Sequence, residues 1–305
     1  MDILPVADSI IILFLLMGIG FAASKAKFLD RNGSKALSSF LVNIALPCLV
    51  VISMQIPVNA DTMEKTQTTL TLALIFFAIS IAVAVIVPMF IPAKYSERGV
   101  FSFMLVFSNL GFMGIPVTQA IFGTDAVFYT TLFMLPFNLL VFTIGILMLR
   151  PDMRMNFNPK LFVNPGIIAS IIGMLFFFTG FTIPSPFYDV MDYLGSTTTP
   201  LAMVVTGALL AMMPLSNLFS DYRIYILSAF RLLIIPVIVY LVISPYATDP
   251  VIFAIPVLLA AMPAAANSVI LAEEYNADSS LASKGVFITT LLSIVTIPLL
   301  AVILM

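Results

Sequence analysis

The fold of this chain is decided by one stretch, Phe107-Ser108-Asn109-Leu110-Gly111-Phe112-Met113-Gly114-Ile115-Pro116, which lies within an apolar segment. Two glycines and a proline fall within its last six residues. Proline removes a helical hydrogen bond and clashes with the preceding turn, while glycine tolerates an unwound backbone. We therefore expect a membrane-spanning helix that is interrupted at this point.

The composition around this stretch requires the lipid bilayer as the solvent. Of the 305 residues, 61% are hydrophobic and 9% are charged, whereas a soluble domain carries roughly 25% charged residues. So few charges cannot cover a surface in water, and a soluble globular protein is excluded. At about 20 apolar residues for each spanning helix plus a connection, the length allows about ten spans.

Hydrophobic runs separated by short polar breaks predict an all-α polytopic membrane protein with ten transmembrane helices in a single domain, 1–305. The predicted spans are 5–24, 35–54, 68–91, 99–122, 126–149, 162–181, 188–212, 223–243, 250–273 and 281–304. The residues before the first span are not basic, and Asp2 and Asp8 are acidic. We therefore interpret the first run as a retained span and not as a cleavable signal.

The basic residues mark one side of the membrane. Eleven of the 13 Lys and Arg residues lie in the first, third, fifth, seventh and ninth breaks between spans. Because cytoplasmic loops carry an excess of Lys and Arg, these breaks are predicted to be cytoplasmic and both termini to lie outside. The fifth break, 150–161, is then a cytoplasmic connecting loop.

Helix-breaking prolines recur at nearly constant distances along the chain. Three pairs, in spans two and seven, three and eight, and four and nine, are 147 to 153 residues apart: Pro47 and Pro200, Pro88 and Pro236, Pro116 and Pro263. We interpret them as two five-span repeats, 1–149 and 162–305. Five spans in each repeat give opposite topologies, the inverted arrangement of many secondary transporters. The alternative is a chance alignment among 20 prolines.

The ninth span carries a matching interruption, Ala261-Met262-Pro263-Ala264-Ala265-Ala266-Asn267-Ser268. A break within the membrane leaves N–H and C=O groups unpaired, so it survives only where protein, water or a ligand satisfies them. Two breaks in corresponding positions of two repeats are the best sequence indication of a transport site. The alternative is that both are ordinary proline kinks.

Such a pair of breaks is suited to an anion. Each second half-helix begins with free N–H groups and a positive dipole end, and proline suits the first helical position because it needs no donor. Two asparagines add directional amide hydrogen bonds. We therefore predict a carboxylate site formed by Asn109, Gly111, Gly114, Pro116, Pro263, Ala265, Asn267 and Ser268.

At these residues the chain resembles the auxin efflux carrier family, which includes plant PIN-type auxin exporters and bacterial malate- or malonate-type permeases. The matching pieces are 43–47, 109–116, Met262-Pro263 and 272–276. The resemblance implies a five-plus-five inverted fold like that of sodium/proton antiporters and bile-acid symporters, with spans four and nine broken and crossing. It also implies that Asn109 contacts the substrate carboxylate.

The chain departs from the plant members of that family in two ways. Only 16 residues run from Arg150 to Pro165, so the long cytoplasmic loop of many plant members is missing. The run 264–266 is all alanine and lacks the larger residues of plant relatives. The chain thus resembles compact bacterial members, and small carboxylates such as malate are expected in place of auxin. The resemblance also implies a homodimer, whose contact is expected at spans one, two, six and seven, although the sequence itself shows no clear seam.

Further residues are candidates for an ion site or for support of the crossing helices, namely Pro47 and polar residues near the prolines: Asn43, Thr198, Thr199 and Gln119. The alternative for them is hydrogen bonding between helices. Arg231 lies about two turns inside the eighth span. It could neutralise a second substrate carboxylate, pair with Asp221 or Glu273, or extend its side chain to the cytoplasmic surface.

These observations predict a secondary carrier of small organic anions in the inner membrane, working by alternating access. The chain has no His and a single Cys, Cys48, so we expect no enzyme, no metal site, no cofactor and no nucleic-acid partner. An anion channel would need rings of carbonyls or charges. Coupling to Na⁺ or H⁺ stays open, as does a sodium-coupled symporter of another organic acid, because no carboxylate lies near the centre of a span.

Overall fold

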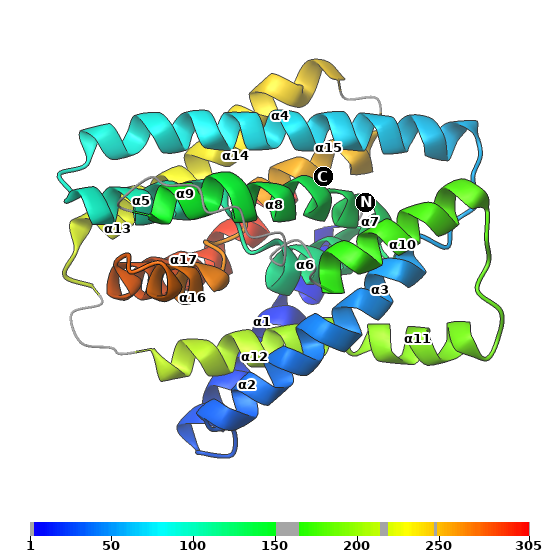
Figure 1. Ribbon diagram of the computed structural model, residues 1–305, viewed down its shortest axis with the longest axis horizontal. Helices are drawn as coiled ribbons and strands as arrows, with labels where there is room; N and C mark the ends of the chain where they lie inside the picture. Colours follow the sequence, from blue (N-terminus) through cyan, green and yellow to red (C-terminus); the bar gives the residue numbers. More distant parts are fainter. Residues whose placement is uncertain (1–2, 151–164, 214–218, 247–248, 305) are drawn as a thin grey trace. The chain divides into compact units, whose positions relative to one another are not determined.

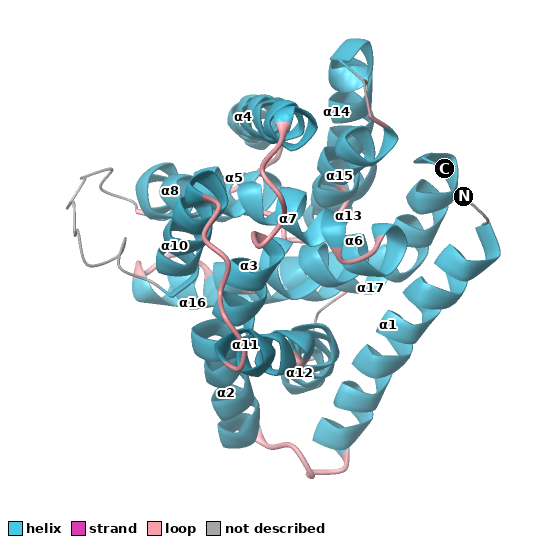
Figure 2. Cartoon of the chain, turned by 90° about the vertical axis from the view of Figure 1, so that its right-hand side faces the viewer, coloured by secondary structure: helices cyan, strands magenta, loops and turns pink. Residues whose placement is uncertain are grey.

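The computed structural model describes residues 3–150, 165–213, 219–246 and 249–304, which fold into helices and connecting loops (Figure 1). Within these ranges no strand is formed (Figure 2). The only β-type pairing in them is an isolated bridge between Ser108 and Ala264. All but one residue of the predicted loop 150–161 lies outside the described ranges. The expected all-helical architecture is confirmed.

Seven helical runs in the described residues are long and apolar enough to cross a membrane: 8–25, 31–53, 60–90, 125–149, 187–212, 222–246 and 279–304. Three shorter apolar helices, 110–122, 165–179 and 250–260, fall within the three remaining predicted spans. The chain is therefore a polytopic membrane protein, while the ten-span repeat stays a prediction.

In the first half of the chain the helices are α1 (Ile3–Lys25), α2 (Arg31–Phe40), η1 (Leu41–Ala45), α3 (Leu46–Ser53), α4 (Ala60–Phe90), α5 (Tyr95–Val106), η2 (Leu110–Gly114), α6 (Ile115–Phe122), α7 (Asp125–Leu132), α8 (Met134–Leu140), η3 (Val141–Gly145) and α9 (Ile146–Leu149). In the second half they are α10 (Pro165–Thr179), α11 (Phe187–Ser196), α12 (Thr198–Met212), α13 (Tyr222–Ala229), η5 (Phe230–Ile234), α14 (Ile235–Ile243), η6 (Ser244–Tyr246), α15 (Pro250–Ala260), α16 (Asn267–Glu274) and α17 (Ser279–Leu304).

Three π-helical turns stand before prolines. The turns η1, η2 and η5 each end two residues before a proline, at Pro47, Pro116 and Pro236. Proline has no N–H and its ring collides with the carbonyl four residues earlier. A wider turn relieves that collision, so the helix bends without being interrupted.

The chain divides into two compact units that each draw on both halves of the sequence. Unit 1 comprises Met1–Leu70, Gly111–Leu135 and Lys160–Met213, and unit 2 comprises Thr71–Leu110, Pro136–Pro159 and Pro214–Met305. The first break in the sequence, before η2, coincides with a boundary between the units. The candidate residues therefore belong to two different compact bodies.

Unit 1 is held together by helices that touch backbone to backbone. A Cβ atom on Gly20 of α1 would overlap the carbonyl group of Val204 in α12, and one on Gly207 would overlap the carbonyl of Met17. These glycines let α1 and α12 approach more closely than side chains would permit. Helices α10 and α11 pack against α3 in the same unit, where Gly195 faces the backbone of Leu49.

Unit 2 is packed around aromatic and methionine side chains next to small residues. A Cβ atom on Gly145 of η3 would come within 2.9 Å of the rings of Phe103 and Phe107. Phe107 also contacts Phe137 edge to face, with ring centroids 5.6 Å apart. This packing fixes the end of α5 and the residue that follows it, where the first break begins.

Candidate functional site

The two breaks are extended segments that pair with each other inside unit 2. One separates α5 from η2 and the other separates α15 from α16. The N–H of Asn109 donates to the carbonyl of Pro263 at 2.8 Å, and the N–H of Ala265 donates to the carbonyl of Phe107 at 3.0 Å. Ser108 and Ala264 lie opposite each other between these two bonds. Both predicted interruptions are thus present, and each satisfies part of the backbone of the other.

The predicted position of the first break is wrong by about one turn. Gly111 and Gly114 lie in the π-helical turn η2 and Pro116 is the second residue of α6, so the backbone is helical where we expected it to be unwound. The π-turn accommodates Pro116, and the helix is interrupted earlier, at 107–109.

The expectation that both prolines begin a half-helix is also wrong. Pro263 lies in the extended segment, four residues before α16 begins, where a missing N–H carries no cost. Pro116 and Pro263 therefore lie in different local structures, one in a helix and the other in an extended segment. The residues that pair across the two breaks are Ser108 and Ala264, which are 156 positions apart.

Two buried polar atoms near the paired breaks have no hydrogen-bond partner among the described residues. They are the Oγ of Ser108 and the Oδ1 of Asn267, and Ser108 is only 1% exposed. Asn267 is the first residue of α16, whose N-terminus has no side-chain cap. Buried polar groups without partners are costly, so such atoms mark a place where a ligand can supply the missing bonds.

Two other predicted residues of the second break have defined roles in the backbone turn. The carbonyl of Ala265 accepts from the N–H of Ser268 at 3.0 Å and from its hydroxyl at 2.5 Å. Ser268 is buried. This turn fixes the first residues of α16 against the extended segment.

Thr289 of α17 supports the second break and was missed from the sequence. Its Oγ1 accepts a hydrogen bond from the N–H of Ala264 at 3.1 Å and donates to the carbonyl of Gly285 at 2.7 Å. The signal in the sequence that could have identified Thr289 is its hydroxyl within the apolar last span. The bond satisfies a backbone donor that the extended segment leaves without a helical partner.

Arg231 lies in η5 and is completely buried. Its Nε donates to the carbonyl of Met262 at 3.0 Å, its Nη1 to Leu105 at 2.8 Å and its Nη2 to Leu259 at 3.3 Å. The alternatives of reaching the surface and of pairing with Asp221 or Glu273 are wrong, because in the described part of the chain its partners are these carbonyls. Contact with a second substrate carboxylate stays a prediction.

The remaining candidates belong to unit 1. Thr199 Oγ1 donates to Gln119 Oε1 at 2.7 Å, whereas the buried Oγ1 of Thr198 has no partner within the described ranges. The amide of Asn43 donates to the backbone and hydroxyl of Ser39 in its own helical run. Pro47 follows η1 in α3. The described residues hold no group of three or more His, Cys, Asp or Glu side chains placed for a metal ion.

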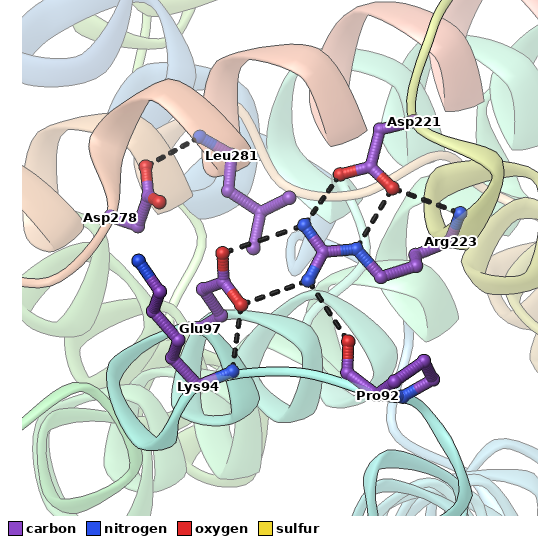
Figure 3. Close-up of polar contacts among 7 residues, drawn as sticks. All are labelled: Pro92, Lys94, Glu97, Asp221, Arg223, Asp278 and Leu281. Carbon is purple, nitrogen blue, oxygen red and sulfur yellow. Dashed lines mark hydrogen bonds and ion pairs between the residues drawn. The ribbon is translucent and has the colours of Figure 1, made fainter.

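An ion-pair network ties α5 to α13 within unit 2 (Figure 3). Arg223 binds Glu97 at 2.8 Å and Asp221 at 2.7 Å, and it also donates to the carbonyl of Pro92 at 3.1 Å. The carboxyls of Glu97 and Asp221 lie outside the predicted spans. Hydrogen bonding to the Arg223 guanidinium holds the pKa of each below its ordinary value. The sequence reading treated Arg223 only as a loop charge.

Comparison with known proteins gives matches along the whole chain. The family profile described as membrane transport protein matches residues 5–160 and 152–301. A Rhizobium meliloti protein provisionally named a malonate transporter is 27% identical, over 93% of this chain and 91% of its own length. Proteins named as uncharacterized transporters are 26% identical in Methanothermobacter thermautotrophicus, over 97% and 98% of the two chains, and 24% identical in Methanocaldococcus jannaschii, over 96% of each.

Proposed function

The chain belongs to the family of membrane transport proteins that includes the auxin efflux carriers, and from this premise we propose that it is a secondary carrier of small organic anions. The carrier binds a substrate carboxylate at the paired breaks and works by alternating access. Malate and related acids are the expected substrates. The name of the Rhizobium meliloti relative adds malonate to the acids to be tested.

The observation that carries this proposal is the pairing of two broken helices beside the buried hydroxyl of Ser108, which has no partner among the described residues and can donate to a carboxylate. The hydroxyl of Ser108 is a donor, and the uncapped N-terminus of α16 offers N–H groups and a positive dipole end. The amides of Asn109 and Asn267 orient the carboxylate. Gly111, Gly114 and Pro116 shape the turn that follows Asn109 in the chain.

The proposal includes a ten-span architecture made of two inverted five-span repeats. The packing of unit 1 supports it, since α1 contacts α12 while α10 contacts α3. In an inverted repeat a contact between spans one and seven has its counterpart between spans six and two. The antiparallel pairing of Ser108 with Ala264 supports it too, because it relates spans four and nine in the same way.

We place the carrier in the inner membrane, and the distribution of Lys and Arg favours both termini outside and the connection 150–161 in the cytoplasm. A homodimer through spans one, two, six and seven fits the apolar side chains exposed along α1 and α10. These are Ile11, Ile12, Leu15, Ile19, Ile168, Ile171, Leu175 and Phe178. Coupling to Na⁺ or H⁺ is left open.

Counterflow tests this function without knowledge of the coupling ion. Proteoliposomes loaded with unlabelled malonate receive labelled malonate outside, with no ion gradient, and a panel of internal acids that includes malate ranks the substrates. The proposal predicts transient accumulation above equilibrium. Failure of every acid in the panel would contradict it, and flux without saturation or exchange would indicate an anion channel.

The site is tested in the same assay with two matched variants. Asn109→Ala removes the proposed carboxylate contact, and we expect about ten- to hundredfold slower counterflow at low malonate, the value of a hydrogen bond to a charged group. Asn32→Ala makes the same change on an exposed residue at the start of α2 and should leave the rate unchanged. Equal rates in the two variants would place the site elsewhere.

A further inference from the structure

We propose that Arg231 is a positioning residue for the carboxylate site. It neutralises the negative ends of α5 and α15 and ties the two breaks together, and it does not itself touch the substrate. This inference rests on the proposed function for its consequence in transport. The structural part of it, the fixing of the two breaks, is tested separately below.

Arg231 binds carbonyls at the two places where the helices are interrupted. In a continuous helix the N–H of Asn109 would bond to Leu105, but here it donates to Pro263. The carbonyl of Leu259 cannot accept from residue 263, a proline without an N–H, and it accepts instead from the N–H of Met262 at 3.3 Å and from Arg231. Arg231 therefore replaces hydrogen bonds that the interruption of each helix removes.

Met262 completes the set, because its carbonyl lies inside the second extended segment and accepts from the Nε of Arg231. One guanidinium thus binds the end of α5 through Nη1, the end of α15 through Nη2 and the second extended segment through Nε. The planar fork of an arginine makes this geometry available, whereas a lysine offers a single point of donation.

The partial negative charges of the two helix C-termini balance the positive charge of Arg231. The C-terminus of a helix carries roughly −0.5 of an elementary charge, so two of them sum to about −1, the opposite of one guanidinium. A fully buried cation is costly unless it is compensated, and the helix ends supply the compensation. The positive N-terminus of α16 then stays available for a substrate anion.

The same geometry argues against a direct contact with the substrate. Arg231 has no exposed surface, and three of its five N–H groups, one on each nitrogen, donate to carbonyls that hold the guanidinium between the breaks. Without it, the negative ends of α5 and α15 would offset the positive end of α16. The residue therefore acts on the anion through the crossing segments.

The first test measures malonate counterflow and its inhibition by acetate in three purified variants. Arg231→Gln should weaken the affinities for malonate and for acetate to the same degree, by about tenfold. The negative helix ends that Arg231 no longer neutralises would affect any anion. Arg231→Lys keeps the charge, so its affinities for both anions should lie between those of Arg231→Gln and those of the parent. Arg223→Gln, which alters an ion pair outside the breaks, is the control and should leave both affinities unchanged. A loss confined to malonate would overturn the proposal in favour of contact with a second carboxylate.

The second test does not depend on transport. With Cys48 replaced by Ser, the double variant Ser108→Cys/Ala264→Cys places two thiols on a directly opposed pair of the non-hydrogen-bonded type. Such pairs have Cα atoms about 4.5 Å apart, within the range for a disulfide. We expect rapid cross-linking with Arg231 present, slower cross-linking by about tenfold with Arg231→Gln, and an intermediate rate with Arg231→Lys.

The two tests separate the two claims. An unchanged cross-linking rate in both Arg231 variants would overturn the positioning role, whatever the protein transports. Slower cross-linking together with no counterflow of any acid would leave the positioning role standing and remove the carboxylate function. If Arg231→Gln does not insert into the membrane, the same comparisons are made with Arg231→Lys, for which a parent-like rate would contradict the proposal.

Discussion

Two arginines eight positions apart on one helical run, Arg223 at the start of α13 and Arg231 in η5, show two ways of holding a charge in this protein. The side chain of Arg223 is 18% exposed and binds the carboxylates of Glu97 and Asp221. Arg231 is not exposed at all and binds three backbone carbonyls. The difference teaches that backbone carbonyls at helix ends can bind a buried cation that pairs with none of the described carboxylates.

The largest expected effect comes from removing each guanidinium in turn. Arg231→Met leaves three carbonyls without their donor in the interior, and we expect a loss of about 3 kcal/mol in the free energy of unfolding. Arg223→Met breaks a partly exposed network and should cost about 1 kcal/mol. Denaturant unfolding of the purified proteins in one detergent measures both. Equal losses would mean that the two arginines are held in the same way.

A lysine at each position sharpens the comparison with a smaller effect. Lysine keeps the charge but not the planar fork. Arg231→Lys should therefore lose about 2 kcal/mol, because one ammonium cannot serve carbonyls on two helices. For Arg223→Lys we expect a change below about 0.5 kcal/mol, since a point charge still meets both carboxylates. Equal losses in the free energy of unfolding for Arg231→Lys and Arg223→Lys would contradict the proposed role of the planar fork at position 231.

Thr289 provides a further way to disturb the crossing segments without touching a charge. Thr289→Val removes the acceptor of the Ala264 N–H at constant shape, with an expected cost of about 1 to 2 kcal/mol. Thr290→Val is the matched control, because that hydroxyl donates only to Val286 in its own helix. Unfolding curves of the two variants should differ by about 1 kcal/mol, and indistinguishable curves would remove Thr289 from the support of the break.

The smallest effect is a pH dependence that belongs to Arg223 and not to Arg231. Each carboxyl paired with Arg223 has a lowered pKa, so it contributes stability that is complete above its ordinary pKa, 4.5 for Glu97 and 3.8 for Asp221. This contribution, about 1 kcal/mol, is lost as the pH falls through the lowered values.

Unfolding measured between pH 7 and pH 3 should therefore show a steeper acid loss in the parent than in Glu97→Gln, which has already lost part of the contribution. Arg231→Lys should keep the slope of the parent, since the partners of Arg231 do not titrate. A slope that survives in Glu97→Gln would assign the acid sensitivity to other carboxyls.

The architecture was readable from the sequence because it depends on local signals. Apolar runs predicted where the helices lie, and each of the two interruptions was found from a proline with small neighbours. The exact position of the first break was not found, since a proline such as Pro116 is accommodated either by an unwound segment or by a π-turn. The choice depends on packing around 107–109, which no local pattern records.

Long-range pairing accounts for the other errors. A sequence gives the depth of Arg231 along its helix but not the two helix ends that meet it, because Leu105 and Leu259 lie more than 25 positions away on other segments. The division into two units was equally out of reach, as each unit combines stretches from both halves of the chain. The place of Asn109 at the first break was predictable because asparagine beside a break is itself a local signal, while its contact with a carboxylate stays a prediction.

The most direct test of the account places a negative charge where the substrate carboxylate is proposed to bind. Asn109→Asp is nearly isosteric, and Asn32→Asp introduces the same charge at the exposed start of α2. Malonate counterflow is measured in proteoliposomes that contain equal amounts of the parent or of either variant. We predict transient accumulation in the parent and in Asn32→Asp and none in Asn109→Asp, while accumulation in Asn109→Asp equal to that of the parent would contradict the carboxylate site at the paired breaks.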